Sequence, residues 1–106
     1  MVTTVTAEAF DTFVKDSDLP VFVDFWAAWC APCRSFSAII DALAEDFDGK
    51  IQVGKVNVEE HPPLSEKYHI MSIPTVCVFS KGELVETIVG SRSYEDMVNY
   101  IEMYLA

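Results

Sequence analysis

The sequence predicts an α/β fold in which a central, mixed five-stranded sheet is flanked by four helices, within one domain over residues 1–106. Three patterns support this prediction. An almost continuous apolar run at 20–26 is typical of a central strand that is covered on both faces. The longest amphipathic stripe follows it, and two short apolar segments around Lys81-Gly82 indicate a hairpin. The order of strands and helices favours a mainly parallel sheet that the hairpin extends, with helices on both faces.

The first element is a short, β-branched strand at 2–5, and a helix follows it. The side-chain oxygen of Thr6 can accept a hydrogen bond from the unpaired amides at a helix start. We therefore expect the helix to begin directly after Thr6. Its apolar face comprises Phe10, Phe13 and Val14.

The segment after the central strand predicts a long helix that begins at two cysteines. Pro32 suits a first helical turn, and Asp48-Gly49 is a stop signal. Between them, apolar residues recur every three or four positions, at Phe36, Ile40, Leu43 and Phe47. Residues 51–58 then alternate like a third strand, and Pro62-Pro63 precede a short helix around 64–68.

The last third of the chain predicts a hairpin and a closing helix. The segments 75–79 and 84–89 are its antiparallel strands, because Gly82 between them can adopt the positive φ that tight hairpin turns need. Ser93 is expected to cap the final helix. The apolar face of that helix has helical spacing and comprises Met97, Tyr100, Ile101, Tyr104 and Leu105.

The charge balance excludes several classes of partner. Seventeen acidic against seven basic residues give a formal net charge of −10, which repels nucleic-acid phosphates and anionic lipid surfaces at long range. The longest apolar stretch, 21–31, is shorter than the roughly 20 residues that a membrane span needs. The amino terminus has neither the basic nor the apolar region of an export signal. We expect a cytoplasmic monomer that binds neither nucleic acid nor membrane.

Two of the three cysteines stand in the segment Cys30-Ala31-Pro32-Cys33, at the predicted start of the long helix. Only a thiolate attacks a disulfide, and a second thiol must then resolve the mixed disulfide. The unpaired amides and the dipole of the helix start should lower the pKa of the Cys30 thiol. Cys33 lies one turn further in. The spacing therefore predicts that Cys30 attacks and Cys33 resolves, and the apolar Ala31-Pro32 pair favours a reductant.

A metal site is the alternative interpretation of this pair. A tetrahedral zinc site needs two further Cys or His ligands at comparable spacing. Cys77 lies alone in an apolar strand, where a buried thiol acts as a small hydrophobe, and His61 and His69 flank a different helix. We expect no metal and no bound cofactor, and a redox-active disulfide between the two motif cysteines instead.

At this motif the sequence resembles the thioredoxin family. The segment Phe25-Trp-Ala-Ala-Trp-Cys-Ala-Pro-Cys33 is similar to the family's active-site segment, and separate matches follow the family's order at Asp24, Lys55, Ile73-Pro74-Thr75, Lys81-Gly82 and Val89-Gly90. The resemblance implies the thioredoxin fold and protein-disulfide reductase activity. It also implies protein disulfides as substrates and a thioredoxin reductase, flavin/NADPH-dependent or ferredoxin-dependent, as electron donor.

The resemblance further assigns roles to residues. It implies that Asp24 is a buried proton-transfer group and that Pro74 follows a cis peptide bond facing the cysteines. The substrate-binding surface would comprise Trp29, Ala31, Pro32, Ile73, Pro74, Val89 and Gly90. Burial should raise the pKa of Asp24, and Lys55 would oppose this rise if it approaches the carboxylate. Otherwise the Lys55 side chain extends to solvent.

Three flanking side chains have two interpretations each. Of Trp26 and Trp29, we expect one to belong to the core and the other, next to Cys30, to cover the site. Arg34 follows Cys33 directly and either steers partners or pairs with a neighbouring acid.

Four positions depart from the family's commonest pattern: Ala31, Ala38, Met71 and Ser72. None removes a reacting group, so they bear on the preferred reductase and the redox potential.

Two other functions compete with that of a reductase. An oxidase or isomerase is disfavoured by the Ala-Pro dipeptide and the missing export signal. A binding module, of a processivity or chaperone-like kind, would bind its partner in a redox-dependent way.

Overall fold

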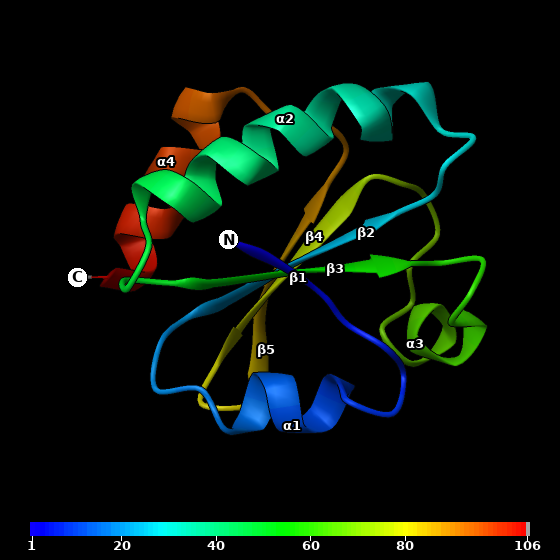
Figure 1. Ribbon diagram of the computed structural model, residues 1–106, viewed down its shortest axis with the longest axis horizontal. Helices are drawn as coiled ribbons and strands as arrows, with labels where there is room; N and C mark the ends of the chain where they lie inside the picture. Colours follow the sequence, from blue (N-terminus) through cyan, green and yellow to red (C-terminus); the bar gives the residue numbers. More distant parts are fainter. Residues whose placement is uncertain (106) are drawn as a thin grey trace.

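Strands and helices follow one another along the chain in the predicted order, with β4 and β5 adjacent as the predicted hairpin (Figure 1). The computed structural model describes residues 1–105. Its strands are β1 (Val2–Thr4), β2 (Val21–Trp26), β3 (Gln52–Asn57), β4 (Thr75–Ser80) and β5 (Glu83–Val89). Its helices are α1 (Phe10–Lys15), α2 (Ala31–Asp46), α3 (Pro62–Lys67) and α4 (Tyr94–Leu105). None of the helices in this part of the chain is long and apolar enough to cross a bilayer.

The strands form one mixed sheet in the order β1-β3-β2-β4-β5. β1 and β2 run parallel to β3, whereas β4 runs antiparallel to both β2 and β5. The carboxyl ends of β2, β3 and β5 therefore meet the amino end of β4 at one edge of the sheet. We call this the cysteine edge, because Cys30 follows β2 there.

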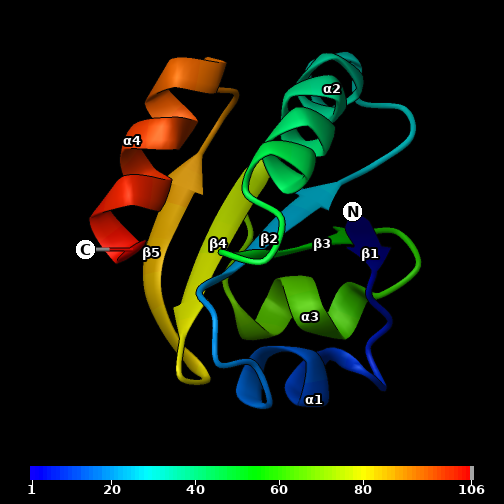
Figure 2. The same ribbon diagram turned by 60° about the vertical axis from the view of Figure 1, so that its left-hand side comes forward.

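Helices cover both faces of the sheet, as predicted (Figure 2). α2 and α4 lie on one face, and their buried side chains share a core cluster with Phe22, Val76 and Val78 of the sheet. α1 and α3 lie on the other face. There Phe10 and Leu64 belong to a second cluster.

The first helix begins later than the sequence predicted. Residues 7–9 form a turn, and α1 starts at Phe10. Thr6 Oγ1 does accept a hydrogen bond, from Ala9 N at 3.2 Å, but this bond closes the turn before the helix. The amide of Ala7 donates to His61 Nδ1 at 3.3 Å. Since an imidazole far along the chain satisfies this amide, the chain does not need a helical start at Thr6.

The closing helix follows the prediction except at its end. Ser93 Oγ accepts a hydrogen bond from Asp96 N at 3.1 Å, which confirms the predicted cap. Met97 and Ile101 are fully buried. Leu105 was expected on the apolar face but is 39% exposed, at the last position of α4.

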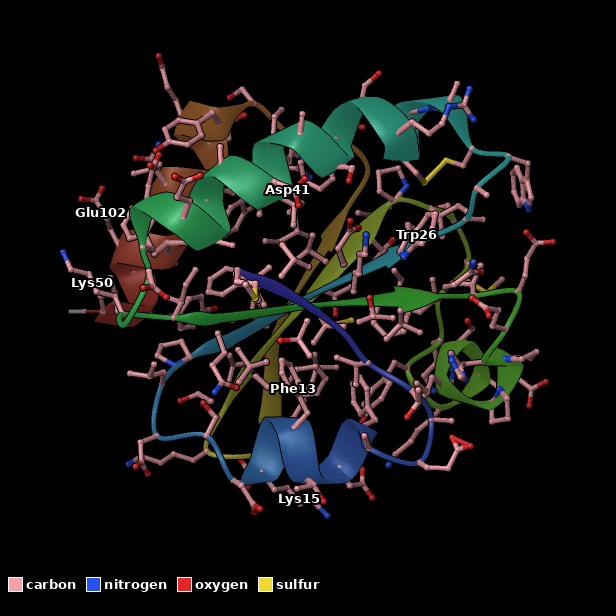
Figure 3. All side chains as sticks on the ribbon, viewed as in Figure 1. Phe13, Lys15, Trp26, Asp41, Lys50 and Glu102 are labelled. Atoms are coloured by element: carbon pink, nitrogen blue, oxygen red, sulfur yellow. A yellow bond between two sulfur atoms is a disulfide. The ribbon has the colours of Figure 1, made fainter. Side chains whose placement is uncertain are left out.

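Gly54 in β3 allows α1 to approach the sheet closely. A Cβ at this position would lie 2.8 Å from Phe13 Cε2 and 2.8 Å from Val5 Cγ2. The Phe13 side chain lies between α1 and the sheet (Figure 3). A side chain at residue 54 would have to displace these neighbours. No local pattern in the sequence marks this requirement.

Candidate active site

Cys30 caps the amino end of α2. Its backbone is extended, with φ −89° and ψ 107°, and its Sγ accepts a hydrogen bond from Cys33 N at 3.2 Å. Pro32 stands in the first helical turn, where a missing amide hydrogen costs little. Because free amides and the helix dipole favour negative charge at this end, the position stabilises a thiolate at Cys30.

Cys30 and Cys33 form a disulfide, with their Cα atoms 5.2 Å apart. This separation is within the ordinary range for disulfides. Both residues are buried, at 4% and 1% exposure respectively, and they pack with Ala27 in a small cluster of their own. The two sulfurs are therefore adjacent, with Cys33 the more enclosed residue.

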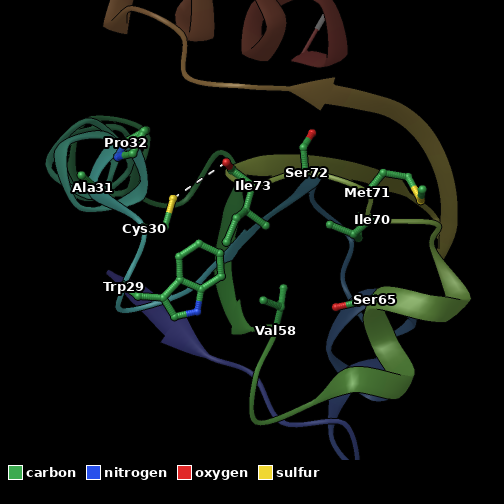
Figure 4. Close-up of a pocket in the computed structure, with 10 residues that line it drawn as sticks. All are labelled: Trp29, Cys30, Ala31, Pro32, Val58, Ser65, Ile70, Met71, Ser72 and Ile73. Atoms are coloured by element: carbon green, nitrogen blue, oxygen red, sulfur yellow. Dashed lines mark hydrogen bonds between the residues drawn. The ribbon is translucent and has the colours of Figure 1, made fainter.

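The loop before β4 faces Cys30 (Figure 4). The Ile73–Pro74 peptide bond is cis, as the family resemblance implied. Cys30 Sγ lies 3.8 Å from the carbonyl oxygen of Ile73, the contact drawn as a dashed line. Thr75 Oγ1 donates to the Ser72 carbonyl at 2.7 Å and so ties the loop to the start of β4. This arrangement brings backbone polar groups next to Cys30 Sγ.

The end of β5 adjoins the same loop. Gly90 N donates to the Pro74 carbonyl at 2.8 Å, and Val89 pairs with Thr75 across the two strands. Val89 is 53% exposed. Thus two residues that are distant in sequence from the cysteines lie beside the proline loop.

A groove of about 520 Å³ borders Cys30 on the side of α3. Four of the residues predicted for substrate binding line it: Trp29, Ala31, Pro32 and Ile73. Its remaining lining is Val58, Ser65, Ile70, Met71 and Ser72, which the sequence analysis did not assign to the site. Met71 is 93% exposed and Trp29 66% exposed. Pro74, Val89 and Gly90 do not line this groove.

Asp24 lies in the centre of the sheet and is 3% exposed. Burial raises the pKa of its carboxyl to about 7, the Lys55 charge opposes this rise, and Asp41 adds to it. Asp24 is directly opposite Lys55 in the parallel β2–β3 pair. Among residues 1–105, its Oδ1 has no hydrogen-bond partner. The contribution of Asp41, from α2 (Figure 3), was not foreseen.

Lys55 also contacts an aromatic ring. Its Nζ lies 5.2 Å from the centroid of the Trp26 ring, a cation–π distance. Trp26 is half-buried and packs against the cysteine cluster, whereas Trp29 is the exposed tryptophan beside Cys30. The two tryptophans thus divide between core and surface, as predicted.

Arg34 contacts the backbone. Its Nη1 donates to the Ala28 carbonyl at 2.8 Å. Within residues 1–105, no carboxylate lies within ion-pair distance of Arg34. The predicted alternative of a neighbouring acid was wrong for this part of the chain, because the side chain folds back over the loop that precedes the cysteines.

Cys77 is buried in β4, and burial raises the pKa of its thiol to about 11. This matches the interpretation of Cys77 as a small hydrophobe. No cluster of three or more potential metal-ligating side chains is present between residues 1 and 105.

Comparison with known proteins agrees with this geometry. The chain matches the family model for Thioredoxin over residues 1–103. It is 40% identical to a thioredoxin of Porphyra purpurea over 105 residues, covering 99% of this chain and 98% of that protein. It is 44% identical to a thioredoxin of Rickettsia bellii over 101 residues, covering 95% and 96%.

A plant relative covers the chain equally well. The chain is 43% identical over 102 residues to "Thioredoxin M-type, chloroplastic" of Spinacia oleracea, covering 96% of this chain and 56% of that protein. These relatives do not favour the alternative of a binding module, and thioredoxins act through their own cysteine pair without a cofactor. With its mixed five-stranded sheet and its Cys30–Cys33 disulfide, the chain belongs to the thioredoxin family and is a protein-disulfide reductase.

Proposed function

We propose that Cys30 is the attacking nucleophile of this reductase and Cys33 the resolving thiol. The Cys30 thiolate attacks one sulfur of a substrate disulfide, the substrate S–S bond breaks, and the other substrate sulfur leaves as a thiolate. Cys33 then attacks Cys30 Sγ in the mixed disulfide and releases the second substrate thiolate. Two electrons pass to the substrate, and the Cys30–Cys33 disulfide remains.

Asp24 is proposed as the general base for the second step. Cys33 must lose its proton before it attacks, and a carboxyl with a pKa of about 7 can accept or return a proton near neutral pH. Transfer through a water would connect this buried carboxyl with the thiol. Lys55 tunes the base, since its charge favours the carboxylate.

Substrate docking is proposed for two strips beside Cys30. The Ile73 backbone would pair with an extended substrate segment, as in strand addition, with Pro74, Val89 and Gly90 beside it. Trp29, Ala31 and Pro32 would cover the substrate from the side of the groove.

The observation that carries this assignment is the position of Cys30 Sγ at the helix start, 3.8 Å from the Ile73 carbonyl. The test compares Cys33→Ser with Cys30→Ser. Because the first variant attacks but cannot resolve, it should accumulate mixed disulfides with oxidised substrate proteins on non-reducing gels and in mass spectra. The second should trap none. Cys77→Ala, which removes a thiol outside the site, is the control and should cycle normally. Equal trapping by both serine variants would refute the assignment.

We also propose that a thioredoxin reductase regenerates the dithiol and that the protein serves electron transport and redox homeostasis. A dithiol reductant needs a reducing compartment, which supports a cytoplasmic location. The plant relative carries a chloroplast designation, so both donor classes should be compared. Insulin-disulfide reduction with NADPH plus a flavin-dependent reductase, or with a ferredoxin-dependent one, identifies the donor that supports turnover.

A further inference from the structure

The seven basic residues of this acidic chain are distributed unevenly around the sheet. Lys50 precedes β3 and Lys81 follows β4, so both lie at the edge opposite the cysteines. Lys15 is at that edge too, because a Cβ on Gly82 would lie 3.0 Å from its Cγ. Figure 3 shows Lys50 far from the disulfide. These three lysines therefore lie at the opposite end of the sheet from a partner that docks at Cys30.

Two other lysines are engaged within the chain. Lys67 Nζ lies 3.5 Å from Asp11 Oδ1, and Lys55 Nζ lies over the Trp26 ring. Arg34 and Arg92 are the remaining cations, and both are at the cysteine edge.

Arg92 is anchored to the strip proposed for substrate docking. Its Nη2 donates to the Val89 carbonyl at 3.2 Å, and its Nη1 lies 3.5 Å from the Tyr100 hydroxyl. Val89 in turn pairs with Thr75, next to the cis proline. This chain of contacts places the Arg92 guanidinium beside the β5 side of the site.

Arg34 is anchored in the same manner to the Ala28 carbonyl. A guanidinium has five N–H donors, so the one contact of Arg34 and the two contacts of Arg92 leave other donors free. Asp96 lines a shallow groove together with Arg92, yet neither arginine has a carboxylate within ion-pair distance in residues 1–105. Both guanidinium groups are held in place but keep donors for a partner.

The opposite side of the site carries negative charge. Glu59 and Glu60 are exposed and follow Val58, the first residue after β3. β3 and β5 lie on opposite sides of the β2–β4 pair, so these two glutamates lie on the β3 side and Arg92 lies on the β5 side. Glu95 and Asp96 follow Arg92 in the first turn of α4. Arg34 lies near the start of α2, beside the cysteines.

From this arrangement we infer that Arg34 and Arg92 select and orient partners that carry carboxylates next to their reducible disulfide. The partner's carboxylates would meet the two guanidinium groups, while Glu59 and Glu60 would repel carboxylates placed on the β3 side. The net charge of −10 opposes the approach of such a partner at long range, so the two arginines act at contact distance. This inference rests on the docking surface that we propose above.

The test measures the second-order rate at which the reduced protein reduces three disulfide peptides. The peptides differ only in the residues flanking the disulfide, which are Glu, Gln or Lys. The double variant R34Q/R92Q is compared with the double variant K50Q/K81Q. Both have the same net charge, but the second is altered at the edge of the sheet opposite the cysteines. The preference of each protein is the ratio of its rate with the Glu peptide to its rate with the Gln peptide.

We expect R34Q/R92Q to lower this ratio by about 2- to 30-fold at low salt, the range for two exposed ion pairs. The difference from wild type should shrink at about 500 mM NaCl, where screening is strong. K50Q/K81Q should keep the wild-type ratio. An unchanged ratio in R34Q/R92Q, or equal changes in both double variants, overturns the inference.

The Gln peptide distinguishes an error in the role of the arginines from an error in the assignment of Cys30 as the nucleophile. If Cys30→Ser reduces the Gln peptide as fast as wild type, the proposed nucleophile is wrong. If the Gln peptide still depends on Cys30 while the ratios are equal in all variants, the nucleophile stands and only the role of the arginines is refuted.

Discussion

Asp24 is the residue at which burial and chemistry conflict most directly. A buried carboxylate without a hydrogen-bond partner is costly, and Oδ1 has none among residues 1–105. Desolvation moves the pKa to about 7, which places the proton exchange of this group near neutrality. Perturbed carboxyls of this kind cluster at active sites. The cost in stability is consistent with the proposed role in proton transfer.

Asp24→Asn should stabilise the folded protein at neutral and alkaline pH. Between the ordinary value of 3.8 and about 7, the folded state holds a proton on Asp24 that the unfolded state releases. Stability therefore falls as pH rises through this window. The variant avoids this loss, by up to about 4 kcal/mol above pH 7 and by little near pH 4. Urea denaturation of both proteins across this pH range measures the difference.

The same variant should turn over more slowly, most clearly near and above pH 7, where the wild-type carboxyl is ionised and can accept the Cys33 proton. Single-turnover resolution of a preformed mixed disulfide isolates this step. If resolution is as fast as in wild type at every pH and stability falls, Asp24 is a structural residue.

At the scale of elements, the contact between α1 and β3 depends on one missing side chain. Gly54 leaves room for Phe13 and Val5, each 2.8 Å from where its Cβ would be. Phe13 lies on α1 and Val5 just after β1. Three segments therefore converge above one glycine, and the packing of the helix on this face depends on it.

Gly54→Ala should destabilise the protein by about 1–3 kcal/mol, the usual cost of overpacking a core. Phe13→Leu shortens the nearest side chain, so the double variant should be more stable than the sum of the single changes predicts. Equilibrium denaturation of the four proteins tests this coupling. Strict additivity would show that the Phe13 ring is not the obstacle.

Sequence reasoning succeeded where structure is encoded locally. The apolar run of β2, the stripe of α2 and the Lys81-Gly82 turn each lie within one short segment, and the cysteine motif is contiguous. It failed where distant segments meet. Two features depend on tertiary packing. One is the hydrogen bond from the Ala7 amide to His61, at a position where a helix was expected. The other is the space above Gly54 that the Phe13 ring occupies.

The residues that line the groove were also predictable only where they lie in the cysteine motif or in a segment that matches the family. Its cysteine side was predictable from the motif and from the family resemblance. Val58 and Ser65 come from the end of β3 and from α3, and no local pattern marks them as neighbours of Cys30. Only the sheet order brings these segments to one edge.

At the scale of the whole molecule, charge repulsion dominates over ion pairing. The net charge is −10, and within residues 1–105 the one ion pair, Lys67–Asp11, has both side chains more than half exposed. Exposed pairs contribute little, whereas an excess of one charge destabilises the compact state. Added salt screens both kinds of interaction, and it should therefore weaken the repulsion between the excess acidic residues more than the attraction within the ion pair.

The melting temperature should accordingly rise as NaCl is increased from about 20 mM to about 500 mM, where the Debye length falls to a few ångströms. Thermal denaturation followed by circular dichroism measures this. Lys67→Gln with Asp11→Asn, which removes the pair without changing the net charge, should show the same rise. A melting temperature that falls with salt would mean that attraction outweighs repulsion.

Cys77 gives the molecule an internal reporter of its own integrity. Its thiol is fully enclosed in β4, and its raised pKa keeps it protonated, so an alkylating reagent should reach it only when the sheet opens. After reduction, Cys30, which borders the groove, is the thiol that such reagents reach in the native state. Mass spectrometry of alkylated protein can thus separate redox turnover, recorded at Cys30, from transient unfolding, recorded at Cys77, within the same sample.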